Sequence, residues 1–150
     1  MGNIVWLASY PKSGNTWLRA FLVNLITDAE KPIDINKMGA LTFGDSQSHW
    51  YAKVSKAIPK SLSSENLASL RPRVHEIIAE SSGNSVFVKT HNALVEVSGT
   101  NMITRSVTAG VIYVIRNPLD VTLSYSDHLG QPIDNIIDLM DRKGFETPGN

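Results

Sequence analysis

Cysteine is absent from this chain of 150 residues. Disulfides, thiolate metal ligands and cysteine nucleophiles are therefore excluded. Neither sign of charge dominates, since 14 basic residues balance 14 acidic ones, and no net basic field points to nucleic acid. The first residues show neither the basic start nor the apolar run of a signal peptide, and no stretch is apolar enough to span a bilayer. We therefore expect a cytoplasmic protein that holds any anionic ligand by local groups.

Short apolar runs without alternation are typical of strands buried on both faces of a sheet. Three such runs occur, at residues 4–8, 85–89 and 111–115. Apolar residues at helical spacing predict helices between and after them, at about 17–26, 64–81, 118–129 and 132–140. Strands that alternate with helices indicate an α/β fold. We expect a P-loop-like parallel sheet flanked by helices and truncated on its C-terminal side.

Proline, glycine and asparagine set the predicted boundaries of several helices. Pro72 is expected to interrupt residues 64–81 and to restart the helix from its first turn. Asn117 is predicted to cap the next helix, with Pro118 at its first position and Gly130 after its end. Residues 31–62 show no clear pattern, so we expect an irregular segment there, of a length that is usually functional.

A polar segment lies between the first strand and the first helix, and it reads Tyr10-Pro11-Lys12-Ser13-Gly14-Asn15-Thr16-Trp17. A helix start offers unpaired N–H groups and a partial positive charge. Gly14 allows a close approach of the backbone to a ligand, and Lys12 adds a full charge. The segment therefore predicts a loop that binds a phosphate-like anion.

A Walker loop requires the pattern G-x-x-x-x-G-K-[ST]. In this chain the first glycine is missing and Asn15 stands at the lysine, while Thr16 keeps the last position. The cation has moved to Lys12, which weakens the case for a metal-dependent nucleotide hydrolase. A P-loop-type kinase or nucleotide-binding protein remains an alternative.

A second cluster of chemical groups follows the third strand. Arg116 comes at the carboxyl end of that strand, where parallel sheets present their ligands. Ser124 lies about 10 Å further along the predicted helix. Both side chains suit a second anion, because arginine binds phosphates with two parallel hydrogen bonds. The alternative is an ordinary ion pair between Arg116 and Asp120.

Histidine follows the second strand in the run Lys89-Thr90-His91. The side chains of this run emerge at the same sheet edge as the loop. Histidine has the right pKa to remove a proton from an alcohol or phenol at neutral pH. We therefore interpret His91 as a general base. His75 is predicted to lie on a helix surface. His128 is predicted to be solvated or structural, and the alternative is that it approaches the site. His49, Trp50 and Tyr51 either line an acceptor pocket or form a partly buried aromatic group.

Three runs of this sequence, Ser9 to Trp17, Lys89 to His91 and Arg116 to Ser124, resemble the signatures of PAPS-dependent sulfotransferases. In that family phosphoadenosine phosphosulfate (PAPS) donates the sulfuryl group. The resemblance implies that Lys12 stabilises the leaving phosphate, that His91 is the base and that Lys89 supplies a supporting charge. It assigns the donor's phosphate to Ser13, Gly14, Asn15 and Thr16, its adenine to Trp17, and its ribose phosphate to Arg116 and Ser124. Trp17 also begins an apolar helix face, so it is alternatively a core residue.

The family resemblance further implies transfer of a sulfuryl group from PAPS to a hydroxyl or amine of a small molecule or glycan. A sulfuryl group carries fewer negative oxygens than a phosphoryl group, so no metal is expected. Family members are usually longer, and we interpret residues 1–150 as the N-terminal portion of a single domain. A non-catalytic remnant is therefore a further alternative. Uncovered apolar surface at a sheet edge would favour self-association.

Overall fold

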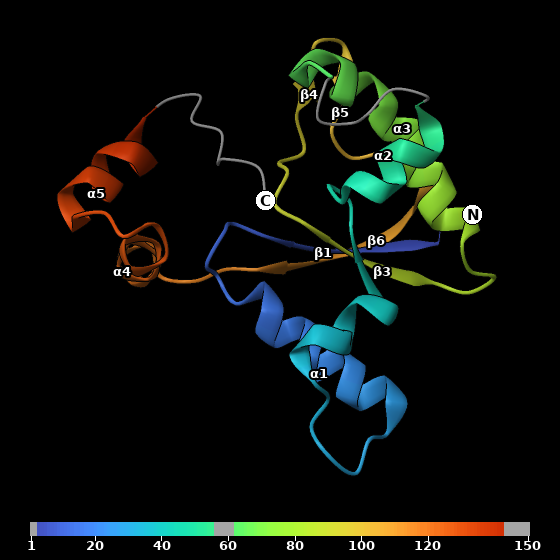
Figure 1. Ribbon diagram of the computed structural model, residues 1–150, viewed down its shortest axis with the longest axis horizontal. Helices are drawn as coiled ribbons and strands as arrows, with labels where there is room; N and C mark the ends of the chain where they lie inside the picture. The colour runs from blue at the N-terminus through green and yellow to red at the C-terminus, as the bar shows by residue number, and fades with distance from the viewer. Residues whose placement is uncertain (1–2, 56–61, 143–150) are drawn as a thin grey trace.

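The structure of the protein is a computed structural model, and residues 3–55 and 62–142 are described here (Figure 1). Its centre is a four-stranded sheet in the order β2-β3-β1-β6, and every neighbouring pair is parallel. These strands are β1 (Ile4–Ser9), β2 (Thr42–Gly44), β3 (Val86–Thr90) and β6 (Thr108–Val114). A parallel sheet between helices confirms the predicted P-loop-like α/β fold.

Strand β1 lies between β3 and β6, and its register fixes where the functional segments meet. Ala8 is paired with Thr90 of β3, and Ser9 is paired with Val114 of β6. All three strands therefore end at one edge of the sheet. The segments that follow them, which contain the predicted site residues, leave from this edge, as expected for an open α/β sheet.

Helices cover the two faces of the sheet unequally (Figure 1). Helix α1 (Asn15–Thr27) lies on one face, and α2 (Ser48–Val54) and α3 (Ser64–Glu80) lie on the other. Helices α4 (Pro118–Leu129) and α5 (Ile133–Asp141) pack together beyond the carboxyl ends of the strands. The remaining elements are short: the 3-10 helices η1 (Ile35–Ala40) and η3 (Arg105–Val107), and a hairpin of β4 (Glu96–Val97) and β5 (Thr100–Asn101).

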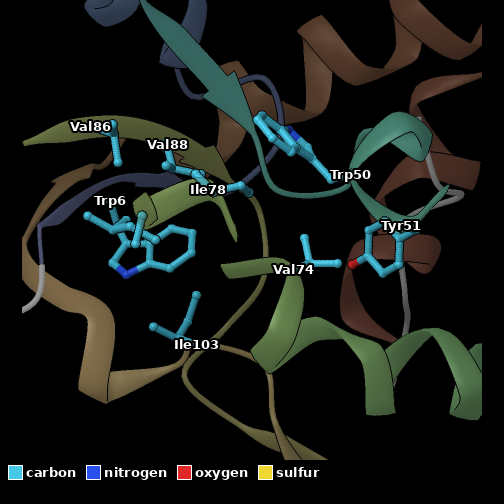
Figure 2. Close-up of a cluster of buried hydrophobic side chains, with 10 residues drawn as sticks. Trp6, Trp50, Tyr51, Val74, Ile78, Val86, Val88 and Ile103 are labelled. Carbon is cyan, nitrogen blue, oxygen red and sulfur yellow. The ribbon is translucent and has the colours of Figure 1, made fainter. Parts of the chain in front are cut away.

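The core lies between the sheet and helices α2 and α3 (Figure 2). Trp6 of β1 and Val88 of β3 pack there with Val74 and Ile78 of α3, and each is at most 1% exposed. Full burial of such a side chain contributes roughly 1.5–3 kcal/mol to the free energy of folding. The Trp6 indole N–H donates to Thr108 Oγ1 over 2.8 Å, which satisfies its one polar group. This packing holds the three long strands in a fixed register.

Two predictions about secondary structure were wrong. Residues 31–55 are not irregular throughout, since β2 and α2 lie there and β2 pairs with β3 from Thr42 to Gly44. The rest of the segment predicted to be irregular, residues 56–61, lies outside the described residues. Pro72 does not restart a helix, because it lies inside the continuous helix α3. A proline in this position removes one backbone hydrogen bond. The buried face of α3 against the sheet compensates for that loss.

Strand β6 is present as predicted but is not buried on both faces. It is an edge strand among the described residues, and its side chains Val111 and Tyr113 are 57% and 63% exposed. Ile115, just beyond it, is 79% exposed. Helix α1 also turns apolar side chains outward, including Phe21 and Leu25. Apolar side chains are therefore exposed both on β6 and on α1. No described helix is long and apolar enough to cross a membrane.

Candidate active site

The loop after β1 owes its shape to two residues with positive φ, Lys12 at 65° and Gly14 at 106°. The N–H of Ser13 donates to the carbonyl of Tyr10, which closes a tight turn. Helix α1 begins directly after Gly14, and no side chain caps it. The first N–H groups of α1 therefore lack a capping partner. Such groups, together with the helix dipole, suit an anion.

Asn15 fixes this loop to the end of β1. Its side-chain amide donates to the carbonyl of Leu7 over 2.7 Å and to Ser9 Oγ over 3.2 Å. The residue is only 4% exposed. Its side chain is therefore occupied in holding the loop, and what Asn15 offers a ligand is its backbone N–H. Ser13, also predicted to bind the donor's phosphate, is 6% exposed, whereas Thr16 is exposed.

The structure brings Lys12 and Arg116 together, although they lie in different signatures. The Arg116 guanidinium donates to the carbonyl of Lys12 over 3.1 Å. Within the described part of the chain, the Lys12 ammonium makes no ion pair or hydrogen bond. Its charge is therefore available to a ligand, and the Arg116 contact orients the backbone that carries it.

Trp17 is 82% exposed and lies in the first turn of α1. The alternative prediction that it is a core residue was wrong for the described structure. An indole so exposed beside an anion-binding loop is free to stack on a flat ligand. It also continues the outward apolar face of α1 formed by Phe21 and Leu25.

His91 contacts the same strand end from which the loop starts. Its Nδ1 lies 2.8 Å from the carbonyl oxygen of Ser9 and 3.3 Å from Ser9 Oγ. A carbonyl oxygen only accepts, so the shorter contact places the proton on Nδ1 and leaves a lone pair on Nε2. Burial lowers the pKa of His91, and this effect outweighs the raising effect of its bond to Ser9. A neutral ring with a free Nε2 is the form that accepts a proton.

Lys89 lies on β3 and points to the same face of the sheet as α1. Its neighbours Val88 and Thr90 are buried toward α3, and successive side chains of a strand alternate. Burial lowers the pKa of Lys89, and the charge of Arg19 on α1 lowers it further. Lys89 therefore lies on the α1 face of the sheet, two residues before His91.

A family model described as the sulfotransferase domain matches residues 3–134 of this chain. The chain belongs to the sulfotransferase domain family. The match includes every residue of the site described above. A search of curated proteins found no match to the sequence.

Not every predicted residue of this sulfotransferase domain is hydrogen-bonded to the loop within the described part of the chain. Ser124 is half-buried on α4, and among the described residues no hydrogen bond joins it to Arg116. The alternative ion pair between Arg116 and Asp120 does not form in this part of the chain. Asp120 instead lies in the first turn of α4, and Asn117 caps that helix by accepting from the N–H of Leu119.

A cleft of about 260 Å³ connects the two signatures of the sulfotransferase domain. Its walls include Tyr10 and Ser13 from the loop and Ile115 and Arg116 from the end of β6. Sites for small molecules usually measure roughly 300–1,000 Å³. This cleft is therefore large enough for one part of a small ligand, and the exposed Trp17 lies outside its walls.

The other histidines do not join the site. His75 was predicted on a helix surface, and this was wrong: it is fully buried, with its ring 4.8 Å from that of Trp6. His49 packs on Trp50, which is buried in the core with Tyr51, so these residues form an aromatic group. His128 stacks on Tyr125 with ring centroids 6.4 Å apart. The described residues contain no group of three acidic or histidine side chains placed to hold a metal.

Sequence reasoning missed Asp45, which comes directly after β2. Asp45 is 3% exposed and forms a buried ion pair with Arg71 of α3, with 2.8 Å between Arg71 Nη1 and Asp45 Oδ2. The same oxygen accepts from Thr90, the residue before His91. No local pattern around Asp45 indicates this role, because the contact depends on the pairing of β2 with β3.

Proposed function

We propose that this sulfotransferase domain uses PAPS as donor and transfers the sulfuryl group to the hydroxyl or amine of a small molecule or glycan. The observation that carries the proposal is the bond from His91 to the Ser9 carbonyl. Ser9 ends β1, and the anion-binding loop follows it at once. A neutral base and an anion site therefore share one strand end, as transfer from an anionic donor to a hydroxyl requires.

Different residues of the site would bind different parts of the donor. The N–H groups of Gly14, Asn15 and Thr16 and the hydroxyl of Ser13 would hold the phosphate that carries the sulfuryl group. Trp17 would stack on the adenine, since its ring is exposed. Arg116 would bind the ribose phosphate with Ser124, and its contact with Lys12 would couple the two phosphate sites.

The proposed reaction moves one proton and one sulfuryl group. His91 Nε2 takes the proton of the acceptor hydroxyl, and the acceptor oxygen forms a new bond to sulfur. The bond from sulfur to the bridging oxygen breaks, and this oxygen leaves with the nucleoside bisphosphate. Lys12 stabilises the charge that develops on the bridging oxygen, and Lys89 adds positive charge nearby. General base catalysis of this kind contributes typically ~10²–10⁴-fold.

Three further points belong to this proposal. Lys12 neutralises the leaving group in place of a metal ion, so transfer is expected to continue in EDTA. We propose a cytoplasmic location, which the lack of cysteine favours. We also propose self-association through the edge strand β6, because its apolar side chains are exposed. That residues 1–150 are the N-terminal portion of a larger domain stays a prediction.

Calorimetry with the desulfated donor tests the binding part of the proposal. The wild-type chain is compared with Lys12→Ala and Arg116→Ala, and Lys31→Ala is the control, since Lys31 is an exposed lysine outside the site. We expect both site variants to lose affinity and the control to keep it. Unchanged affinity in both site variants would show that the phosphate sites are wrongly assigned.

A transfer assay with generic phenols and alcohols then separates the alternatives. Sulfate transfer in the presence of EDTA, abolished by His91→Ala, supports the proposal. ATP binding that requires Mg²⁺ would indicate a P-loop-type kinase. Binding of the donor without any transfer would indicate a non-catalytic remnant.

A further inference from the structure

Asp45 holds the chain on both sides of His91. Its Oδ2 accepts from Thr90 Oγ1 over 2.9 Å and from Asn92 Nδ2 over 2.8 Å. Its backbone N–H donates to the carbonyl of Lys89 over 3.2 Å. Thr90 and Asn92 are the two neighbours of His91 in sequence. A single buried acid therefore fixes the backbone immediately before and after the proposed base.

Helix α3 fixes Asp45 in turn. Arg71 Nη1 donates to the same Oδ2 over 2.8 Å, and both side chains are less than a tenth exposed. A hydrogen-bonded buried ion pair has a defined geometry, since charged partners prefer short, directed bonds. The acid is therefore anchored to α3 as well as to the segment around His91.

If the ion pair of Asp45 with Arg71 only joined the end of β2 to α3, Asp45 would make no contact with Thr90 and Asn92. Here three donors meet on one oxygen, and two of them flank His91. Asn92 is fixed further by its own N–H, which donates to Thr90 Oγ1 over 3.1 Å. The backbone on both sides of His91 thus has one arrangement, and the imidazole reaches the Ser9 carbonyl from it.

We infer that Asp45 is a positioning residue for His91: by holding Thr90 and Asn92 it keeps His91 Nδ1 on the Ser9 carbonyl and Nε2 free toward the loop. This inference rests on the proposed function only in calling His91 the base. The arrangement of the ring is a property of the chain itself. It is measured without donor or acceptor, so the two proposals fail separately.

Nitrogen NMR of the labelled imidazoles tests the inference in the full chain, with His91 assigned by its loss in His91→Gln. In the wild type we expect one tautomer for His91, protonated on Nδ1. Asn92→Ala removes one of the two flanking contacts and keeps the pair of Asp45 with Arg71. Asp45→Asn weakens both flanking contacts, those with Thr90 and Asn92. In each variant the two ring-nitrogen signals should move toward the average of a tautomer mixture, further in Asp45→Asn.

Ser46→Ala is the matched control, because the Ser46 hydroxyl donates to the other oxygen of Asp45, Oδ1, over 3.1 Å. Its loss leaves the contacts to Thr90 and Asn92 in place, so the wild-type signals are expected. Asp45→Asn leaves Arg71 buried without its charged partner and risks unfolding. If Asp45→Asn does not fold, the spectrum of Asn92→Ala alone tests the inference. A wild-type His91 spectrum in a folded Asn92→Ala or Asp45→Asn variant overturns the inference.

Kinetics give a second readout where the wild type transfers sulfate. A displacement of about 1 Å in a catalytic group costs on the order of 10²-fold in rate, so kcat of Asn92→Ala should fall by roughly 10-fold to 100-fold. The Kd of the desulfated donor should stay within about twofold, because the loop is unchanged. A loss of donor affinity with unchanged kcat would overturn the positioning role.

Discussion

The buried ring of His75 makes acid stability the most quantitative test of this structure. The ring is inaccessible to solvent, with Trp6 against its edge and Thr104 Oγ1 2.8 Å from Nδ1. Burial lowers its pKa from 6.5 to about 4; Asp45 opposes this shift and Arg71 adds to it. The folded state therefore keeps His75 neutral where the unfolded chain binds a proton.

The sign follows from this difference in protonation. Above the unfolded pKa of 6.5 both states are neutral at His75, and the folded protein has its full stability. As pH falls from 6.5 toward 4, His75 becomes protonated in the unfolded state but stays neutral in the folded state, so the free energy of unfolding decreases. At 1.36 kcal/mol per pKa unit the full loss is about 3 kcal/mol. About 2 kcal/mol of it falls between roughly pH 7 and pH 5.

Urea unfolding at a series of pH values measures this loss, and His75→Gln isolates it because glutamine does not titrate. Burial also lowers the pKa of His91, so some pH dependence will remain in the variant. The difference between wild type and variant should fall by about 2 kcal/mol over this range. Ser69→Ala, an exposed change on the same helix, should follow the wild type. Parallel curves for wild type and His75→Gln would refute the buried, neutral histidine.

Three further predictions concern the loop and helix α1. Gly14→Ala should reduce the free energy of unfolding by roughly 1–2 kcal/mol, because φ at this position is 106°. The added Cβ would meet only Val114 Cγ1, at 3.9 Å, so the cost comes from the backbone and not from a clash. A reduction smaller than about 0.5 kcal/mol would contradict this backbone geometry. Asn15→Ala should cost about 1–3 kcal/mol in urea unfolding, since it removes the two bonds to Leu7 and Ser9. Trp17→Ala should change stability by no more than about 0.5 kcal/mol, because the ring is exposed. The same variant should nevertheless bind the desulfated donor more weakly in calorimetry, by the ~1–3 kcal/mol typical of base stacking. An affinity equal to that of the wild type would show that Trp17 does not stack on the donor.

The elements that the sequence predicted well are those with local signals. The start of α4 is an example: Asn117 and Pro118 define it by capping chemistry that acts over a few residues. The place of the loop between β1 and α1 is another, because a short polar run separates two apolar patterns there. Strands β1 and β3 were found from their apolar runs.

The missed features depend on contacts between distant segments. Strand β2 has three residues and exists because it pairs with β3, so its own sequence carries little signal. The burial of His75 results from the packing of α3 on Trp6, which helical spacing alone does not reveal. Asp45 was missed for the same reason, since its partners Arg71 and Thr90 are distant in sequence.

The central place of β1 in the sheet has a consequence for how the protein folds. Both neighbours of β1 come much later in the chain: the contact from His91 to Ser9 spans 82 residues, and that from Arg116 to Lys12 spans 104. Contacts so distant in sequence require closure of long loops before they stabilise anything, which slows folding. During synthesis the apolar strand β1 therefore stays unpaired until both β3 and β6 have left the ribosome. The loop that follows β1 is among the first parts of the site to be made and among the last to be fixed.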